Sequence, residues 1–233
     1  GVADGMSKGV TFLLKKNKVD VIMGTGKVLT GKRIEVTAND GGTQVLEAAN
    51  IIIATGARSR QLPNLTQDGN KIIGYREAMT LKSQPKKMVV VGSGAIGVEF
   101  AYFYNSIGTD VTIVEYMDGI VPVEDKEIGK QLQKSLKKQG ITIKTSSEVT
   151  SVDTSGNGCK VSVKTKKGDE VIDCDIVLSA VGVVANIENI GLEDVGIATD
   201  KGKILVDEFY MSNIPGCFAI GDCVPGQALA HVA

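Results

Sequence analysis

Hydrophobic and polar residues follow two periodic patterns along this chain, one typical of helices and one typical of strands. Near the start, Met6, Val10, Leu13 and Leu14 recur at helical spacing above a basic end, which predicts an amphipathic helix within residues 1–17. Short runs rich in valine and isoleucine predict strands at 19–22, 32–37, 45–47, 51–53, 88–91, 111–114, 204–207 and 217–220. Helices alternating with buried strands favour an α/β fold.

One order of elements occurs twice in the chain. The first copy contains LKKNKVDVI, RIEVT and NIIIATG, and the second contains LKKQGITIK, KVSVKT and DIVLSAVG. Each copy runs through a helix, a strand, a small β-meander, an apolar strand and a turn that ends at Gly56 or Gly182. We therefore expect two Rossmann-like dinucleotide-binding domains, each with a small β-meander.

A complete glycine turn precedes only the second copy, so we expect the second domain to be inserted in a truncated first one. The expected bounds are 1–81 for the first part of the first domain, 82–203 for the inserted domain and 204–233 for the return segment. Residues 58–85, with two prolines and a short helical piece at 76–82, are expected to form a linker.

The clearest motif lies at residues 86–115, which read as strand, glycine turn, helix and second strand. Gly92, Gly94 and Gly97 have the spacing G-x-G-x-x-G directly after an apolar strand. In such a motif the first glycine allows a tight turn, the second leaves room for a pyrophosphate and the third allows close helix packing. The phosphates would face the helix N-terminus, where free N–H groups favour negative charge.

Two acidic residues at strand ends are further candidates. Glu115 follows Gly97 by 18 residues, where a carboxylate can accept hydrogen bonds from a ribose and would repel the extra phosphate of NADP. The motif therefore predicts NAD, although an acid at a strand end can also be merely solvated. Asp222 follows the strand at 217–220 and could bind cofactor hydroxyls or cap a turn.

Composition narrows the class of protein. With 233 residues, 42% hydrophobic content and a net charge of −1, the chain is expected to be globular and to have no electrostatic attraction for nucleic acid. No apolar run is long enough to span a bilayer and no signal peptide is visible, so we expect a cytoplasmic protein, or a mitochondrial matrix protein in a eukaryote.

The cysteines and the histidine give no indication of a metal site. Cys159, Cys174, Cys217 and Cys223 lack C-x-x-C spacing, and His231 is the only histidine. We expect each cysteine to be a small buried hydrophobic residue and not a redox centre.

Four motifs in this order resemble the flavoprotein disulfide reductases, and among them the dihydrolipoamide dehydrogenases most closely. They are IIIATGA at 51–57, GSGAIGVE at 92–99, CFAIGD at 217–222 and ALAH at 228–231. The resemblance implies FAD and NAD as cofactors, with FAD in the first domain and NAD in the inserted one. It also implies a homodimeric full-length enzyme that regenerates lipoamide on a lipoyl domain, with reduction of NAD through FAD and a redox disulfide.

The resemblance also implies roles for individual residues. Gly92, Gly94, Ile96 and Gly97 would hold the NAD pyrophosphate, Glu115 the ribose, and Val149, Ala180 and Gly182 the adenine and nicotinamide ends. Thr55, Gly56 and Asp222 would contact FAD, with Ala230 and His231 near the flavin and Glu99 beneath it.

Departures from the family pattern bear on activity. The chain has no C-x-x-x-x-C pair, no first G-x-G-x-x-G and no histidine–glutamate acid–base pair, and Val183 stands where the family usually has arginine. We therefore expect a central fragment that is inactive by itself. Two alternatives remain open, namely a sister reductase for another disulfide, peroxide or metal ion, and a non-catalytic NAD-binding module.

Overall fold

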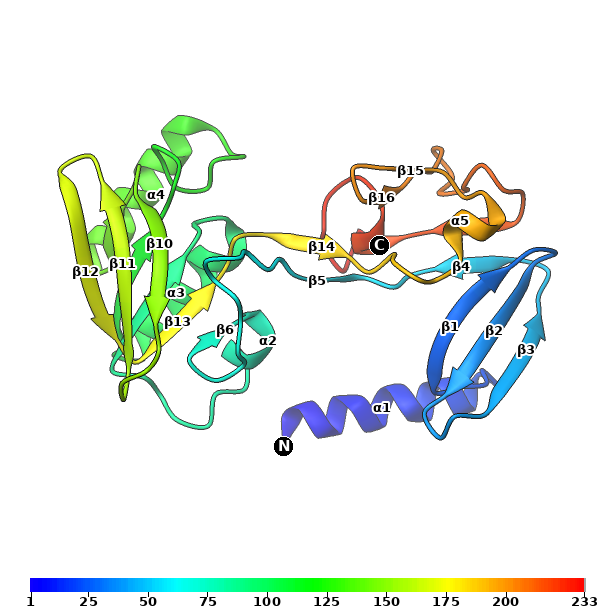
Figure 1. Ribbon diagram of the computed structural model, residues 1–233. Helices are drawn as coiled ribbons and strands as arrows, with labels where there is room; N and C mark the ends of the chain where they lie inside the picture. The colour runs from blue at the N-terminus through cyan, green and yellow to red at the C-terminus, as the bar shows by residue number, and fades with distance from the viewer. Residues whose placement is uncertain (233) are drawn as a thin grey trace. The chain divides into compact units, whose positions relative to one another are not determined.

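The computed structural model describes residues 1–232, which form two compact units (Figure 1). Unit 1 combines Gly1–Ala57 with the segment from Ala185 onward, and unit 2 is Arg58–Val184. The chain leaves unit 1 within β5 (Ala57–Ser59) and returns to it within β14 (Val183–Ala185). The structure is therefore α/β, with one unit inserted in the other, as the repeat predicts.

Unit 2 is built on a five-stranded parallel sheet in the order β6-β13-β7-β8-β9. Its strands are nearly continuous apolar runs because both faces of the sheet are covered. Met88 and Val90 belong to the core on one face, and Val89 and Val91 belong to the core on the other. The strands are β6 (Ile72–Ile73), β7 (Lys87–Val91), β8 (Asp110–Val114), β9 (Thr142–Lys144) and β13 (Ile176–Ser179).

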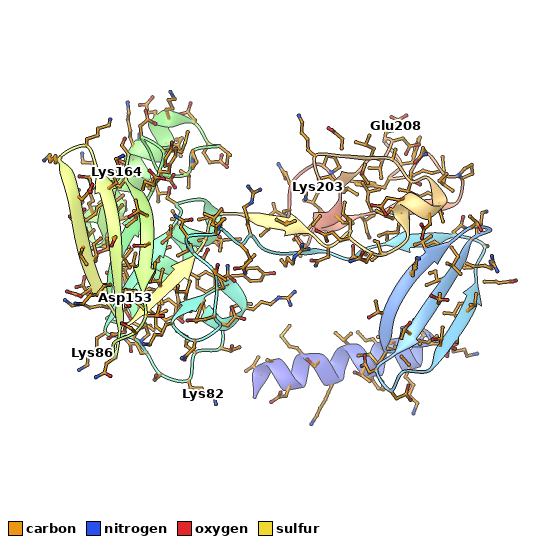
Figure 2. All side chains as sticks on the ribbon, viewed as in Figure 1. Lys82, Lys86, Asp153, Lys164, Lys203 and Glu208 are labelled. Carbon is orange, nitrogen blue, oxygen red and sulfur yellow. The ribbon has the colours of Figure 1, made fainter. Side chains whose placement is uncertain are left out.

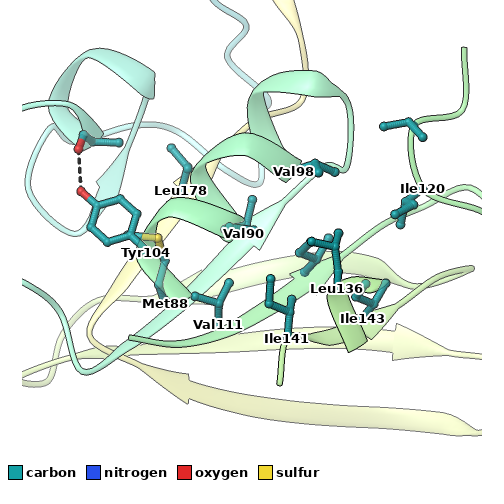
Figure 3. Packing of buried hydrophobic residues seen from close by; sticks show 14 of the residues in the cluster. Met88, Val90, Val98, Tyr104, Val111, Ile120, Leu136, Ile141, Ile143 and Leu178 are labelled. Carbon is teal, nitrogen blue, oxygen red and sulfur yellow. Dashed lines mark hydrogen bonds between the residues drawn. The ribbon is translucent and has the colours of Figure 1, made fainter. Parts of the chain in front are cut away.

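Two helices, α3 (Ala95–Ser106) and α4 (Lys126–Lys138), cover the face of the sheet that carries Met88 and Val90. Val98 and Tyr104 of α3 and Leu136 of α4 pack with the sheet (Figure 3). The Tyr104 hydroxyl donates a hydrogen bond of 2.5 Å to the carbonyl oxygen of Ala78, at the end of α2 (Tyr75–Ala78). This bond satisfies a buried polar group and fixes α2 against α3.

The other face of the sheet is covered by an antiparallel meander of β10 (Glu148–Asp153), β11 (Cys159–Thr165) and β12 (Gly168–Cys174). Alternate residues of β11 point inward, so that Cys159, Val161 and Val163 are buried while their neighbours are more exposed. Asp153 and Lys164, which Figure 2 labels, mark the two ends of this meander.

Unit 1 contains the matching meander, made of β1 (Gly24–Leu29), β2 (Arg33–Ala38) and β3 (Thr43–Glu47). Its parallel part consists of β4 (Ile51–Ile53) and β17 (Cys217–Ala219). The core of unit 1 joins these strands to α5 (Leu192–Val195) and β16 (Lys203–Ile204), which pairs with β15 (Thr199–Asp200). Both predicted meanders are therefore present.

The first helix, α1 (Val2–Lys16), is present as predicted, but none of its residues is buried. No helix within residues 1–232 is long and apolar enough to cross a membrane.

The strand predicted at 19–22 is wrong, because the chain there is irregular and β1 begins only at Gly24. A strand needs a neighbour to bind its backbone groups, and among the described residues β4 pairs only with β17. Val19, Val21 and Ile22 are accordingly exposed, by 40–60%.

Residues 58–85 are more than the expected linker, because they contain the edge strand β6, which pairs with β13. The two compact units divide between Ala57 and Arg58 and between Val184 and Ala185. The return segment likewise joins unit 1 from Ala185, and Ala185, Leu192 and Ile197 lie in that unit's core.

Candidate dinucleotide-binding site

The order of the parallel sheet reverses between β7 and β13. From β7 the chain goes to β8 and then β9 on one side, and it later returns to β13 on the other side. Ligands of open α/β sheets bind at such a reversal, beyond the carboxyl ends of the strands. At that edge the backbone N–H of Ala180 donates to the carbonyl of Val91 at 2.8 Å, and that of Gly92 donates to Val114 at 2.9 Å. The residues predicted to border the dinucleotide thus come from neighbouring strand ends.

The three glycines of the motif are required for three different reasons. Gly92 has φ +97°, and a Cβ there would lie 2.4 Å from the carbonyl oxygen of Ala180. A Cβ on Gly97 would lie 2.1 Å from the carbonyl oxygen of Gly92, so only glycine lets α3 pack this closely on the turn. Gly94 differs, because no atom lies within 4 Å of its Cβ position. The space beside Gly94 is open, as a site for a pyrophosphate requires.

Gly94 is also the N-cap of α3, and no side chain caps the helix. The first intrahelical bond of 3.0 Å runs from the N–H of Val98 to the carbonyl of Gly94. The N–H groups of Ala95, Ile96 and Gly97 precede it, and such groups have no intrahelical acceptor. The open space at Gly94 therefore lies at the positive end of a helix of 12 residues.

Glu115 is buried, with 6% of its surface exposed, and is held by three hydrogen bonds. Its Oε2 accepts from the backbone N–H of Ser93 at 2.8 Å and from the Ser93 hydroxyl at 2.7 Å. Its Oε1 accepts from the backbone N–H of Met117 at 2.7 Å. A carboxylate offers about four acceptor positions, so one remains for a ribose hydroxyl. The carboxylate also ties the glycine turn to the end of β8.

Ser93 is the residue at this site that sequence reasoning missed. It occupies the first variable position of G-x-G, where the motif gives no reason to choose a hydroxyl. Its side chain is fully buried, and its hydroxyl donates to Glu115. The sequence feature that could have identified Ser93 is its small polar side chain between Gly92 and Gly94.

A hollow of about 300 Å³ opens beside the strand end that carries Glu115. Ser147, which lines the hollow, is hydrogen-bonded to Glu115: its N–H donates to the carbonyl of Glu115 at 2.9 Å. The hollow is lined by Tyr116, Ser146, Ser147, Glu148, Lys164, Thr165 and Lys166, none of which the sequence singled out. Two of the lining residues, Lys164 and Lys166, are basic.

The other candidates of unit 2 are Val149, Gly182, Ile96 and Glu99. Val149 is buried in the core under the meander, and its carbonyl accepts from Asn64 Nδ2 at 2.6 Å. Gly182 has φ +104° and its carbonyl accepts from the N–H of Arg60 at 3.0 Å. Ile96 is half-buried, and Glu99 is exposed on α3.

In unit 1 the structure brings Thr55, Gly56 and Asp222 to one edge. Ile53 of β4 is in register with Ala219 of β17, and because the strands are parallel, Thr55 and Asp222 both follow carboxyl ends. Asn186 fixes the first turn, donating from Nδ2 to the carbonyl of Thr55 at 3.0 Å and from its N–H to that of Gly56 at 2.9 Å. This is the edge at which parallel sheets bind ligands.

Two more features of unit 1 concern this edge, namely the contact that holds Asp222 and the position of Ala230 and His231. Lys203, labelled in Figure 2, donates from Nζ to the carbonyl of Asp222 and so holds the short helix Gly221–Cys223. Ala230 and His231 are exposed near the end of the described residues. No hydrogen bond within residues 1–232 joins them to Thr55, Gly56 or Asp222.

Comparison with known proteins identifies the family. The family model described as pyridine nucleotide-disulphide oxidoreductase matches residues 1–233. The chain belongs to the pyridine nucleotide-disulphide oxidoreductase family. This confirms the resemblance drawn from the four motifs.

Relatives of this pyridine nucleotide-disulphide oxidoreductase include dihydrolipoyl dehydrogenases. The chain is 42% identical over 231 residues to the mitochondrial dihydrolipoyl dehydrogenase of Pisum sativum, covering 98% of this chain and 46% of the relative. It is 43% identical over 233 residues to the dihydrolipoyl dehydrogenase of Zymomonas mobilis, covering 100% of this chain and 50% of the relative. The chain thus spans about half the length of the curated relatives it matches.

Solved structures agree on the fold of this oxidoreductase. LpdA of Mycobacterium tuberculosis matches with a TM-score of 0.90 and 33% identity, covering 100% of this chain and 51% of that one. The HOCl-induced flavoprotein disulfide reductase RclA of Escherichia coli matches with a TM-score of 0.82 and 26% identity, covering 97% and 52%. The predicted Rossmann-like fold of a flavoprotein disulfide reductase is confirmed.

Proposed function

We propose that this chain is the dinucleotide-binding part of a dihydrolipoyl dehydrogenase. The complete enzyme would oxidise dihydrolipoamide to lipoamide with reduction of NAD, through FAD and a redox disulfide. Its partners would be a lipoyl domain and a second copy of the enzyme. The names of the relatives support the reaction, and the glycine turn tied to Glu115 is the observation in this chain that carries the proposal.

NAD, when bound, supplies the nicotinamide that accepts a hydride. The space beside Gly94 and the N–H groups of Ala95, Ile96 and Gly97 would take its pyrophosphate. Glu115 would accept a hydrogen bond from the adenosine ribose. Ala180 and Gly182, after β13, would border the nicotinamide, and Val149 would lie towards the adenine. Gly92 and Ala180 lie against each other, since a Cβ at Gly92 would lie 2.4 Å from the carbonyl oxygen of Ala180.

FAD, when bound, supplies the relay between the dithiol and the nicotinamide. Thr55 and Gly56 after β4, and Asp222 after β17, would bind it through backbone groups and one carboxylate at the shared strand edge. Ala230 and His231 would lie near the flavin ring.

The charges near Glu115 make the choice of nucleotide a direct test. The buried carboxylate, fixed by three donors, would repel the 2′-phosphate of NADPH. Lys164 and Lys166 in the adjacent hollow would instead attract a phosphate. We propose that Glu115 decides the preference, because its charge is buried and is therefore screened less than those of surface lysines.

Calorimetric titration of the purified chain with NADH and with NADPH tests this proposal. We expect NADH to bind, and to bind more tightly than NADPH. Glu115→Gln should narrow the difference, whereas Lys166→Ala, which removes a charge that would attract the 2′-phosphate, should not narrow it. Absence of binding by either nucleotide, or tighter binding of NADPH, would contradict the proposal.

The substrate of the complete enzyme needs its own assay. The structural match to RclA makes a sister disulfide reductase the alternative within the family. Turnover of dihydrolipoamide by the complete enzyme, measured as NADH formation, is the expected result. Turnover confined to another disulfide would assign the chain to the sister group.

A further inference from the structure

Cys159 and Cys174 face each other across two antiparallel strands. They are register partners, at the start of β11 and the end of β12. Directly opposite residues in an antiparallel pair have Cα atoms about 4.5–5.5 Å apart, and their side chains leave the sheet on the same face. A disulfide needs a Cα separation of about 4.4–6.8 Å, and the separation expected for register partners falls within that range.

The two thiols share one buried environment. Cys159 is 1% exposed and Cys174 is 6% exposed, and both belong to the core between the meander and the parallel sheet. Cys159 Sγ lies 3.9 Å from the carbonyl oxygen of Lys71 and 3.7 Å from that of Asp175. Burial raises the pKa of Cys159, and it raises that of Cys174 to about 12. Reaction therefore depends on opening of the meander, which exposes the thiols and restores ordinary thiolate formation.

The position of Cys174 allows such an opening, because β12 is the edge strand of its sheet. The meander has the order β10-β11-β12, so within residues 1–232 β12 pairs with one strand only. Local opening in proteins involves elements with few partners before it involves the centre of a sheet. A bond between Cys159 and Cys174 would fasten this edge strand at its final residue.

The other two cysteines provide an internal comparison. Cys217 lies in β17 and Cys223 in the short helix that follows it, so they share no register. Cys223 Sγ donates to the carbonyl oxygens of Ile220 at 3.1 Å and Ile53 at 3.5 Å, within the core of unit 1. Both are buried thiols, but neither faces a partner thiol in a neighbouring strand.

We propose that Cys159 and Cys174 are an oxidisable dithiol that a small disulfide, such as oxidised glutathione, converts to a cross-strand disulfide linking β11 and β12. One thiolate attacks the small disulfide, forms a mixed disulfide and releases one small thiolate. The second cysteine attacks the protein sulfur of the mixed disulfide and releases the other. The two cysteines lose two electrons and two protons, and the small disulfide is reduced to two thiols.

The pair lies at the end of unit 2 opposite to the glycine turn. Asp175, which follows Cys174, accepts hydrogen bonds at Oδ2 from the N–H groups of Lys86 and Lys87 at 2.8 and 2.9 Å, at the start of β7. Lys86 and Asp153, both labelled in Figure 2, lie at this end of the unit. Gly92 follows the opposite end of β7. Oxidation is therefore expected to leave NADH affinity unchanged, and the proposal stands or falls independently of the proposed function.

Incubation of the reduced chain with oxidised glutathione, at mildly alkaline pH in the absence of denaturant, tests the proposal. Thiols are then counted in denaturant, and peptides are mapped by mass spectrometry without reduction. We expect two of the four thiols to disappear, the mass to fall by two hydrogen atoms, and one linked pair of peptides to contain Cys159 and Cys174. Dithiothreitol should restore all four thiols.

Matched variants separate this pair from the other cysteines. Cys174→Ser should abolish the intramolecular bond, whereas Cys217→Ser and Cys223→Ser should keep it. The wild-type chain gives a second measurement that needs no variant, because the oxidised form should unfold at a higher urea concentration than the reduced form. Four surviving thiols, a bond involving Cys217 or Cys223, or a bond formed only after complete unfolding would overturn the proposal.

Discussion

The Oε2 atom of Glu115 accepts two hydrogen bonds from Ser93, a residue 22 positions earlier in the chain. One comes from the backbone of the glycine turn and one from the serine hydroxyl. The acid proposed to bind the ribose is therefore also the acceptor that fixes the conformation of the turn. Substitutions of Glu115 alter the turn together with the ribose contact, so the two effects have to be measured separately.

Ser93→Ala and Glu115→Ala should separate the contributions of this contact to stability. Ser93→Ala removes one hydrogen bond to a charged group, so the free energy of unfolding should fall by about 1.5–3 kcal/mol. Glu115→Ala leaves the hydroxyl and two N–H groups without their acceptor and should cost more. Urea denaturation measures both. If Glu115→Ala were as stable as the wild type, the structural role of the carboxylate would be wrong.

Substitution of Gly94 should weaken NADH binding, whereas substitution of Gly97 should weaken the fold. Gly94 has φ −65° and open space at its Cβ, so Gly94→Val should fold and yet fill the space proposed for the pyrophosphate. We expect NADH affinity to fall at least about a hundredfold, which corresponds to about 2.7 kcal/mol. Gly97→Ala would place a Cβ 2.1 Å from a carbonyl oxygen and should lower stability by about 1–3 kcal/mol. Circular dichroism and calorimetry distinguish the two, and unchanged NADH binding by folded Gly94→Val would refute the phosphate site.

Alkaline pH should destabilise the reduced protein through Cys174. Burial raises the pKa of this thiol from 9.0 to about 12, so the folded state holds a proton that the unfolded state releases. The contribution is fully present below pH 9 and is lost as the pH rises towards 12. Urea midpoints measured across this range with a reductant present should decline, and the decline should be shallower in Cys174→Ala. Cys223→Ala, which removes a buried thiol outside the pair, is the control. An equal slope in both variants would exclude Cys174 as the cause.

The chain by itself should not turn over lipoamide, even with FAD supplied. Its four cysteines are all buried and contain no C-x-x-x-x-C pair. The one facing pair, Cys159 and Cys174, lies at the amino end of β7, whereas the dinucleotide turn follows the carboxyl end. An NADH-linked lipoamide assay and the absorption spectrum of the purified chain check this. Turnover with a stoichiometric flavin band would show that the expectation is wrong.

The glycine turn was predictable because its signals are local. A tight turn, a close helix and an open phosphate space are requirements of single residues, and Gly92, Gly97 and Gly94 each meet one of them. The positive φ lies at Gly92, the tight-turn glycine, whereas Gly94 has φ −65°. The two meanders were predictable for a related reason, since alternation and turn residues reveal hairpins between neighbouring segments.

Features that depend on pairing between distant segments were not predictable. Residues 19–22 have a strand pattern but no neighbour, so they remain irregular. Ser93 gains its role only because β8 brings Glu115 beside the turn. Cys159 and Cys174 are separated in sequence by a hairpin whose register alone makes them partners. Periodicity identifies the face of an element, but it does not identify the residue opposite.

The short strand β6 determines which segment can be transplanted as a module. It precedes the glycine turn in sequence, yet it completes the parallel sheet beside β13. Lys71, just before it, donates from Nζ to the carbonyl of Thr154 at 2.6 Å and also to that of Gly156. The segment that contains β6 is therefore also hydrogen-bonded to the loop between β10 and β11. A nucleotide-binding cassette that started at the glycine turn's own strand would leave the backbone of Val177 and Leu178 without its partner. The transferable cassette therefore starts at Arg58 and ends at Val184, and carries its own edge strand with it.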